Sequence, residues 1–145
     1  MIGARRISRF AASVAIVVAA GLALASCSGA GAQSGNAVEN YAGGPKGVAG
    51  RGGSELEPFA SWLAGGEQIA LTLYGSSGCP PVGDTMRVAS SNSLVVSVVP
   101  IPPDQACTAD YAPHTTVFAT PDDVTTSSDV SIRVDDQSIT LKAMR

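Results

Sequence analysis

Beyond residue 55 the chain carries short runs in which apolar and polar side chains alternate, a period of two that predicts half-buried β-strands. Ile69, Leu71 and Leu73 alternate with smaller or polar residues. A shorter strand is expected at residues 86–89, and residues 115–119 are rich in β-branched and aromatic side chains. Clusters of Gly, Pro, Asn and Asp between these runs predict the intervening turns.

Residues 94–99 form an almost continuous apolar run. Such a run is typical of a central strand that is covered on both faces, and Pro100 ends it because proline has no N–H to donate to a neighbouring strand. Residues 91–93 are polar and predict the hairpin connection to the strand before it.

The last hairpin is the best-specified element of the chain. If residues 135–136 form a two-residue loop, Ile132 lies opposite Ile139 and Val130 lies opposite Leu141. One face of the hairpin is then apolar on both strands, which fixes which side is buried.

Six short strands with turns between them predict an all-β fold, a small antiparallel β-sandwich that is immunoglobulin-like in outline, over residues 55–145. Phe59, Trp62 and Leu63 are expected to pack over one end of it. A region of this length is enough for one hydrophobic core and too short for two. The sequence therefore predicts a single domain.

The N-terminal segment has the construction of an export signal. Arg5, Arg6 and Arg9 precede an apolar stretch at residues 10–24. This stretch is shorter than the roughly 20 apolar residues that cross a bilayer, and no basic cluster follows it. We therefore expect cleavage and not a membrane-spanning anchor.

The segment after the export signal is rich in glycine. Residues 28–54 contain nine glycines, and Tyr41 is the only aromatic residue among them. Gly-rich segments with few large side chains are typical of flexible linkers. We expect residues 27–54 to connect the N-terminus to the folded domain.

Leu24, Ala25, Ser26 and Cys27 resemble the lipobox of bacterial lipoproteins. The resemblance implies that residues 1–26 are a signal peptide, and that Cys27 becomes the lipidated first residue of the mature chain. Two or three acyl chains, palmitate among them, keep a protein on a membrane for long times. We expect a lipoprotein on the extracytoplasmic face of the cell membrane. The alternative is a secreted protein that is cut at a nearby Ala-x-Ala site and keeps Cys27 free.

If Cys27 carries lipid, only Cys79 and Cys107 remain, and two cysteines allow a single pairing. Exported proteins meet an oxidising environment, so we expect these two to form a disulfide. Cys79 follows one predicted strand and Cys107 precedes another, as suits antiparallel neighbours. The alternative is two separate thiols.

The charge of the mature chain argues against a nucleic-acid partner. After residue 26 there are six basic and twelve acidic residues, a net charge of −6. Such a chain offers no basic surface for phosphates. The excess of Arg over Lys, the Gly-rich linker and residues 75–81 and 107–113 resemble small lipoproteins of actinobacteria. That resemblance covers most of the chain and implies no particular activity.

Candidate chemistry is sparse. His114 is the only histidine, and Ser76 and Ser77 lie in a Gly-rich turn that lacks the nucleophile-elbow pattern. Five aspartates that could attract calcium match no known loop spacing and suit ordinary turns; they are Asp122, Asp123, Asp129, Asp135 and Asp136. We expect no cofactor, no metal site and no catalytic residue.

Two hypotheses on function follow. The first is a non-enzymatic module, held on the membrane through Cys27, that binds another envelope protein or a cell-wall component through loops or a sheet edge. The second is a small envelope hydrolase or metal-dependent enzyme that uses Ser76, Ser77, His114 and the aspartates. The second requires those groups to meet in one pocket.

Overall fold

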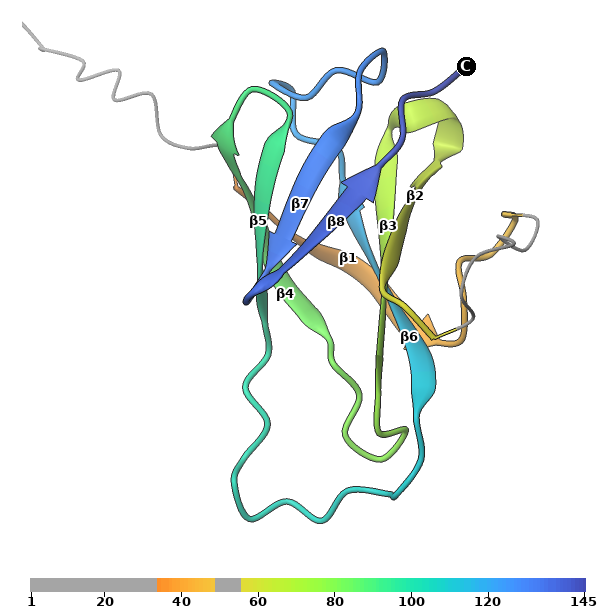
Figure 1. Ribbon diagram of the computed structural model, residues 1–145, viewed down its shortest axis with the longest axis vertical. Coiled ribbons are helices and arrows are strands. Elements are labelled where there is room, and N and C mark those ends of the chain that lie inside the picture. Colours follow the sequence, from red (N-terminus) through yellow and green to blue (C-terminus); the bar gives the residue numbers. More distant parts are fainter. Residues whose placement is uncertain (1–33, 49–55) are drawn as a thin grey trace, which may run out of the picture.

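The computed structural model describes residues 34–48 and 56–145. Their strands form two mostly antiparallel sheets that pack face to face, and the described part also holds one short 3-10 helix, Ala64–Gly66 (Figure 1). The expected all-β sandwich with one disulfide is confirmed. The predicted signal peptide and Cys27 lie outside the described residues. No helix within these two ranges is long and apolar enough to cross a membrane.

Strand β1 is shared by the two sheets. The first sheet has the order β2-β3-β6-β1 and the second has the order β1-β4-β5-β7-β8. The strands are β1 (Ser34–Ala42), β2 (Phe59–Leu63), β3 (Gln68–Gly75), β4 (Gly83–Ser90), β5 (Ser93–Val98), β6 (Ala112–Ala119), β7 (Val130–Val134) and β8 (Gln137–Leu141).

The hairpin register predicted for the last two strands is confirmed. Ile132 pairs with Ile139 and Val130 pairs with Leu141 across β7 and β8. All four side chains are buried in the core. The alternation of apolar and polar residues therefore identified the buried face correctly.

The core lies between the two sheets and takes large side chains from both. Its fully buried members include Ile69, Leu71, Met86, Leu94, Phe118, Val130, Ile132 and Leu141. The prediction that β5 is covered on both faces is wrong: its burial alternates, and Ser97 is exposed. The strands with both faces buried are β3 and β6. Their outer faces use small residues such as Ala70 and Thr115, which give no hydrophobic run.

Phe59, Trp62 and Leu63 do not cap one end of the sandwich, as the sequence had suggested. They belong to β2, which pairs with β3 along its whole length. The segment is short, and its inward positions are only Ala60 and Trp62. Its strand character follows from pairing with β3 and not from its own pattern.

The prediction of a flexible linker is wrong for Ser34–Ala42, which forms β1. This strand pairs with β4 at its start and with β6 over the rest of its length. Among the side chains of β1 that the structure describes, Ala37 is the one that packs against the core. Two further hydrogen bonds hold its far end, from the Gly43 N–H to the Pro113 carbonyl at 2.9 Å and from the Thr115 hydroxyl to the Gly43 carbonyl at 2.7 Å. The folded unit therefore begins well before residue 55.

One strand pair departs from the expected antiparallel arrangement. Strands β5 and β7 are parallel, with Leu94 opposite Ile132. Between them the chain crosses to the other sheet as β6 and returns, so β7 starts at the end where β5 starts. Parallel neighbours need such a crossover.

Candidate functional site

Three connections meet at one end of the sandwich. They are residues 76–82 between β3 and β4, residues 99–111 between β5 and β6, and the turn at residues 135–136. The strand pairings place them together: Gly75 pairs with Ala112, and Gly83 pairs with Val98. Figure 1 shows the two longer connections extending beyond the sheets on the same side. We call this the disulfide end.

The disulfide joins the two longer connections. Cys79 and Cys107 are bonded, with their Cα atoms 5.3 Å apart, which confirms the predicted pairing. Cys79 is buried, whereas Cys107 is exposed. The bond fixes the exposed connection 99–111 to a part of the chain that is anchored in the core.

A hydroxyl network reinforces this bond. The Thr108 hydroxyl accepts a hydrogen bond from the Gly78 N–H at 2.9 Å and donates one to the Asp110 carboxylate at 2.6 Å. The Ser77 N–H donates to the same carboxylate oxygen at 2.9 Å. Hydrogen bonds from the Ser77 side chain, the Thr108 hydroxyl and the Ser77 backbone lower the pKa of Asp110 to about 2. Asp110 is therefore ionised at neutral pH.

Ser76 and Ser77 are part of this network. The Ser76 hydroxyl lies 2.8 Å from the Thr108 hydroxyl oxygen, and the Ser77 hydroxyl lies 3.1 Å from the same atom. His114 is buried on β6, where its Nε2 lies 3.1 Å from the Asn40 Oδ1, and burial lowers its pKa. No hydrogen bond found in the described ranges links His114 to either serine.

The aspartates named for metal binding lie at both ends of the molecule. Asp135 and Asp136 are in the turn at the disulfide end, whereas Asp122, Asp123 and Asp129 are in the connection between β6 and β7 at the opposite end. Among the residues with described positions, no group of three or more His, Cys, Asp or Glu side chains could hold one metal ion. The groups that the enzymatic hypothesis needs are thus distributed over separate parts of the sandwich.

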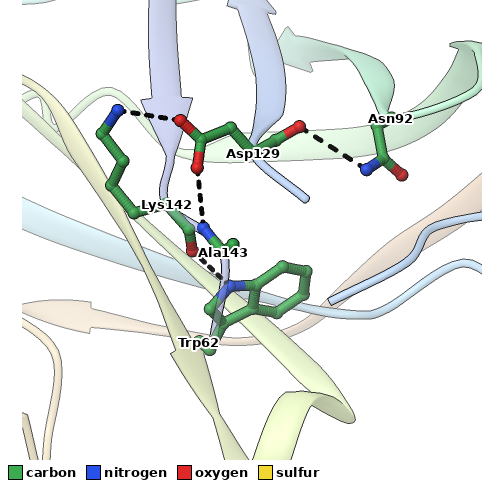
Figure 2. A network of polar contacts seen from close by, with 5 residues as sticks. All are labelled: Trp62, Asn92, Asp129, Lys142 and Ala143. Atoms are coloured by element: carbon green, nitrogen blue, oxygen red, sulfur yellow. Dashed lines mark hydrogen bonds and ion pairs between the residues drawn. The ribbon is translucent and has the colours of Figure 1, made fainter. Parts of the chain in front are cut away.

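The opposite end carries a structural network (Figure 2). The Trp62 indole N–H donates to the Lys142 carbonyl, and the Lys142 amine contacts the Asp129 carboxylate at 2.8 Å. The Ala143 N–H donates to the second oxygen of that carboxylate at 2.9 Å. Asn92 bonds the Asp129 carbonyl from the turn between β4 and β5. These contacts hold the C-terminal segment in place.

The disulfide end contains a cleft of about 320 Å³. Its walls come from six separate stretches of the chain, and they are formed by Pro58, Leu73, Tyr74, Pro81, Val98, Tyr111, Val134, Asp135, Asp136 and Gln137. A second hollow of about 310 Å³ adjoins it and shares Pro58 and Gln137. Most of the side chains in the first hollow are apolar, and its two charged residues are acidic. We call the first hollow the cleft.

Two tyrosines form one wall of the cleft. The rings of Tyr74 and Tyr111 stack with their centroids 5.6 Å apart and an angle of 26° between their planes. Tyr111 is 55% exposed, although the neighbouring disulfide and hydroxyl network hold its connection. Gly75 permits the close packing of this wall, because a Cβ there would lie 2.7 Å from the Pro81 ring.

The sequence interpretation missed this cleft. It assigned no site to Tyr74 or Tyr111, which lie 37 positions apart in the chain. The sequence did offer one sign of the site, because an aromatic residue lies at the border of each connection that carries a cysteine. Because those connections are bonded to each other, the two aromatic residues become neighbours.

Comparison with protein-family models, with curated proteins and with solved structures found no match for the chain.

Proposed function

We propose that the protein is a lipid-anchored lipoprotein of the extracytoplasmic face of the cell membrane, and that its β-sandwich is a non-enzymatic binding module. Its partner is an envelope protein or a cell-wall component that contacts the disulfide end. The observation that carries the binding function is the cleft, in which the stacked Tyr74 and Tyr111 form a rigid aromatic wall.

The location rests on two features of the chain. The residues before Cys27 resemble a lipobox, and the Cys79–Cys107 disulfide suits an oxidising compartment. A lipid on Cys27 carries two or three acyl chains, enough for long-lived membrane residence. Nucleic acid is not expected as a partner, because the chain after residue 26 has a net charge of −6.

The exposed apolar residues of the disulfide end support binding through side chains. Val99, Ile101 and Tyr111 all lie in the connection 99–111 and are each at least 45% exposed. The disulfide and the Thr108 network restrain this connection, so little conformational freedom remains to be lost on binding. A restrained, partly apolar surface is a favourable binding surface.

The direction of β1 sets the orientation of the cleft relative to the anchor. Ala42 pairs with His114 near the disulfide end, so Ser34 lies toward the opposite end. Six residues separate Cys27 from Ser34, and seven Cα–Cα steps span at most about 25 Å. A lipid on Cys27 therefore keeps the opposite end near the membrane and turns the cleft outward.

The anchor is tested by the mass of the intact protein after purification from membranes. We expect a chain that begins at Cys27 and carries the mass of a diacylglyceryl group and its acyl chains. The Cys27→Ser variant should keep its leader and lack this mass. An unmodified mature wild-type chain in the soluble fraction would remove the anchor from the proposal.

The binding surface is tested by photo-crosslinking in intact cells. A photoreactive amino acid at Ile101 probes the disulfide end, and one at Ser128 probes the exposed connection at the opposite end. We expect a defined crosslinked product from Ile101 and a weaker or absent one from Ser128. Equal labelling from both positions would contradict a partner at the disulfide end.

A further inference from the structure

Building on the proposed binding function, we propose that the cleft takes an extended, basic segment of a protein partner. In this complex an aliphatic or proline side chain occupies the cleft, and a neighbouring Lys or Arg lies against Asp135 and Asp136.

The size of the cleft favours one or two side chains as the occupant. Its volume of about 320 Å³ is at the lower end of the range of roughly 300 to 1,000 Å³ found for small-molecule sites. The walls offer Leu73, Val98 and Val134 beside the tyrosine pair. Aliphatic and proline side chains pack well on such surfaces, and the rigid tyrosines lose little entropy when they are covered.

The adjoining hollow favours an extended chain. It is lined by Glu57, Pro58, Gln137, Ser138 and Ile139, so it continues from the cleft along the start of β8. The two hollows share two of their lining residues. A peptide that places one side chain in the cleft can therefore continue into the second hollow without leaving the surface.

The charges around both hollows select a basic partner. The charged residues that line them are Asp135, Asp136 and Glu57, and all three are acidic. Within the described part of the chain, no hydrogen bond or ion pair engages the side chain of Asp135 or Asp136. Asp110, next to Tyr111, adds a further negative charge. These carboxylates attract a cationic segment and repel acidic lipids.

A set of synthetic nonapeptides tests this proposal directly. Four fluorescent peptides share one length: a Leu-Pro centre flanked by Lys and Arg, the same centre flanked by Gln, the same centre flanked by Glu, and an Ala-Ala centre flanked by Lys and Arg. The protein is expressed from the complete sequence, processed by the host and purified in detergent. Fluorescence anisotropy measures the binding of each peptide to it. We expect the first peptide to bind most tightly and to weaken as the salt concentration rises.

Variants at the cleft separate the apolar from the electrostatic contribution. Tyr111→Ala should weaken binding of the first peptide by roughly 30-fold, as expected for a buried aromatic contact, while Tyr111→Phe should keep binding within about twofold. The double variant D135N/D136N should weaken it by roughly fivefold to tenfold and flatten its salt dependence. The matched control D122N/D123N changes the net charge equally at the opposite end and should bind like the wild type.

The outcomes separate this inference from the proposed binding function. If the Gln- or Glu-flanked peptide binds as tightly as the basic one, and Tyr111→Ala still weakens binding, the basic partner is wrong and the binding function stands. Chito-oligosaccharides are also titrated in place of the peptides. If they bind and Tyr111→Ala weakens that binding, the basic partner is again wrong and the binding function stands. If no peptide binds, or D122N/D123N weakens binding as much as D135N/D136N, the inference is overturned, and the crosslinking experiment decides the binding function independently.

Discussion

The indole N–H of Trp62 donates a hydrogen bond of 2.7 Å to the backbone carbonyl of Lys142. This contact joins β2, at one edge of the first sheet, to the segment that follows β8, at one edge of the second. The Lys142 amine in turn contacts Asp129. The Trp62 hydrogen bond thus connects the two sheets along the side where no shared strand does so, and the Asp129 contacts hold the segment that receives it (Figure 2).

The substitution Trp62→Phe tests this connection. It removes the N–H donor and part of the ring, so we expect the free energy of unfolding to fall by about 1 to 2 kcal/mol. The ion pair is exposed, and Lys142→Met should cost less, about 0.5 kcal/mol. Urea unfolding of both variants measures the difference. If both substitutions lower the free energy of unfolding by the same amount, the indole hydrogen bond contributes no more than the exposed ion pair.

The disulfide should contribute a large part of the stability of the domain. Cys79 and Cys107 are 28 positions apart, and closing a loop of that length stabilises a chain by about 3.5 kcal/mol in the chain-entropy model. We expect the double variant C79A/C107A to unfold at a much lower urea concentration than the oxidised wild type. The reduced wild type is the matched control and should resemble the variant. An unchanged midpoint would contradict this role.

Stability should fall in strongly acidic solution because of Asp110. Hydrogen bonds lower its pKa in the folded protein from 3.8 to about 2, so the unfolded chain takes up the proton first. The stabilisation is complete above about pH 4 and is lost as the pH falls toward 2. We expect D110N to show a shallower loss between these values in urea unfolding at a series of pH values.

Asp129 provides the comparison for this experiment, because the Lys142 and Ala143 hydrogen bonds also lower its pKa. D129N should therefore remove a separate part of the same pH dependence. If D110N and the wild type have parallel stability curves, the Thr108 network does not stabilise the charged carboxylate.

The turn between β7 and β8 contains a residue in an unfavourable conformation. Asp135 has a φ of 49°, in the left-handed region that favours glycine, whereas Asp136 is not among the residues with positive φ. We expect Asp135→Gly to raise the free energy of unfolding by roughly 1 kcal/mol and Asp136→Gly to lower it by about 0.5 kcal/mol. Thermal unfolding of the two variants measures both. If both substitutions change the free energy of unfolding in the same direction, the strain does not lie at residue 135.

Strand β1 should be essential for folding. A chain that begins at residue 55 lacks it, and the edges of β4 and β6 are then left without their partner. Exposed strand edges promote association between molecules. We expect such a chain to unfold or aggregate at 25 °C, whereas one that begins at Ser28 should show a cooperative urea transition. Equal stability of the two chains, measured with size-exclusion chromatography as a check on association, would show that β1 is dispensable.

The sequence predicted those strands whose faces differ in polarity. In β7 and β8 the alternation of Ile132 and Ile139 with polar neighbours identifies the inner face, and the turn fixes the register. Strand β3 was also found, because its inward positions are large and aliphatic. In each case the side chains carry the signal, so no knowledge of distant residues is needed.

Strands β1 and β2 could not be predicted in the same way. Of the described side chains of β1, only Ala37 packs against the core. The position of the strand depends on the edges that β4 and β6 offer, far along the chain. Main-chain hydrogen bonds hold this strand, and they leave no mark on the pattern of side chains. The high glycine content and the scarcity of large side chains therefore led to the prediction of a linker over residues 28–54.

The cleft depends on long-range geometry for the same reason. Tyr74 lies near the end of β3, and Tyr111 directly precedes β6. The two residues meet because β3 pairs with β6 and the disulfide joins the adjoining connections. The pairing of Cys79 with Cys107 was predicted from the number of cysteines. The stacking of the two rings was a consequence that the sequence interpretation did not draw.

The position of β1 also determines how the protein responds to a mechanical load. If a lipid on Cys27 holds one end and a partner pulls on the disulfide end, tension enters the sandwich along β1. The hydrogen bonds that join β1 to β4 and to β6 are perpendicular to the strand. A force along β1 therefore loads many of these hydrogen bonds at the same time, and they cannot break one after another. If the proposed lipid anchor and the proposed partner are both present, the strand expected to be a linker is the one that transmits force between them.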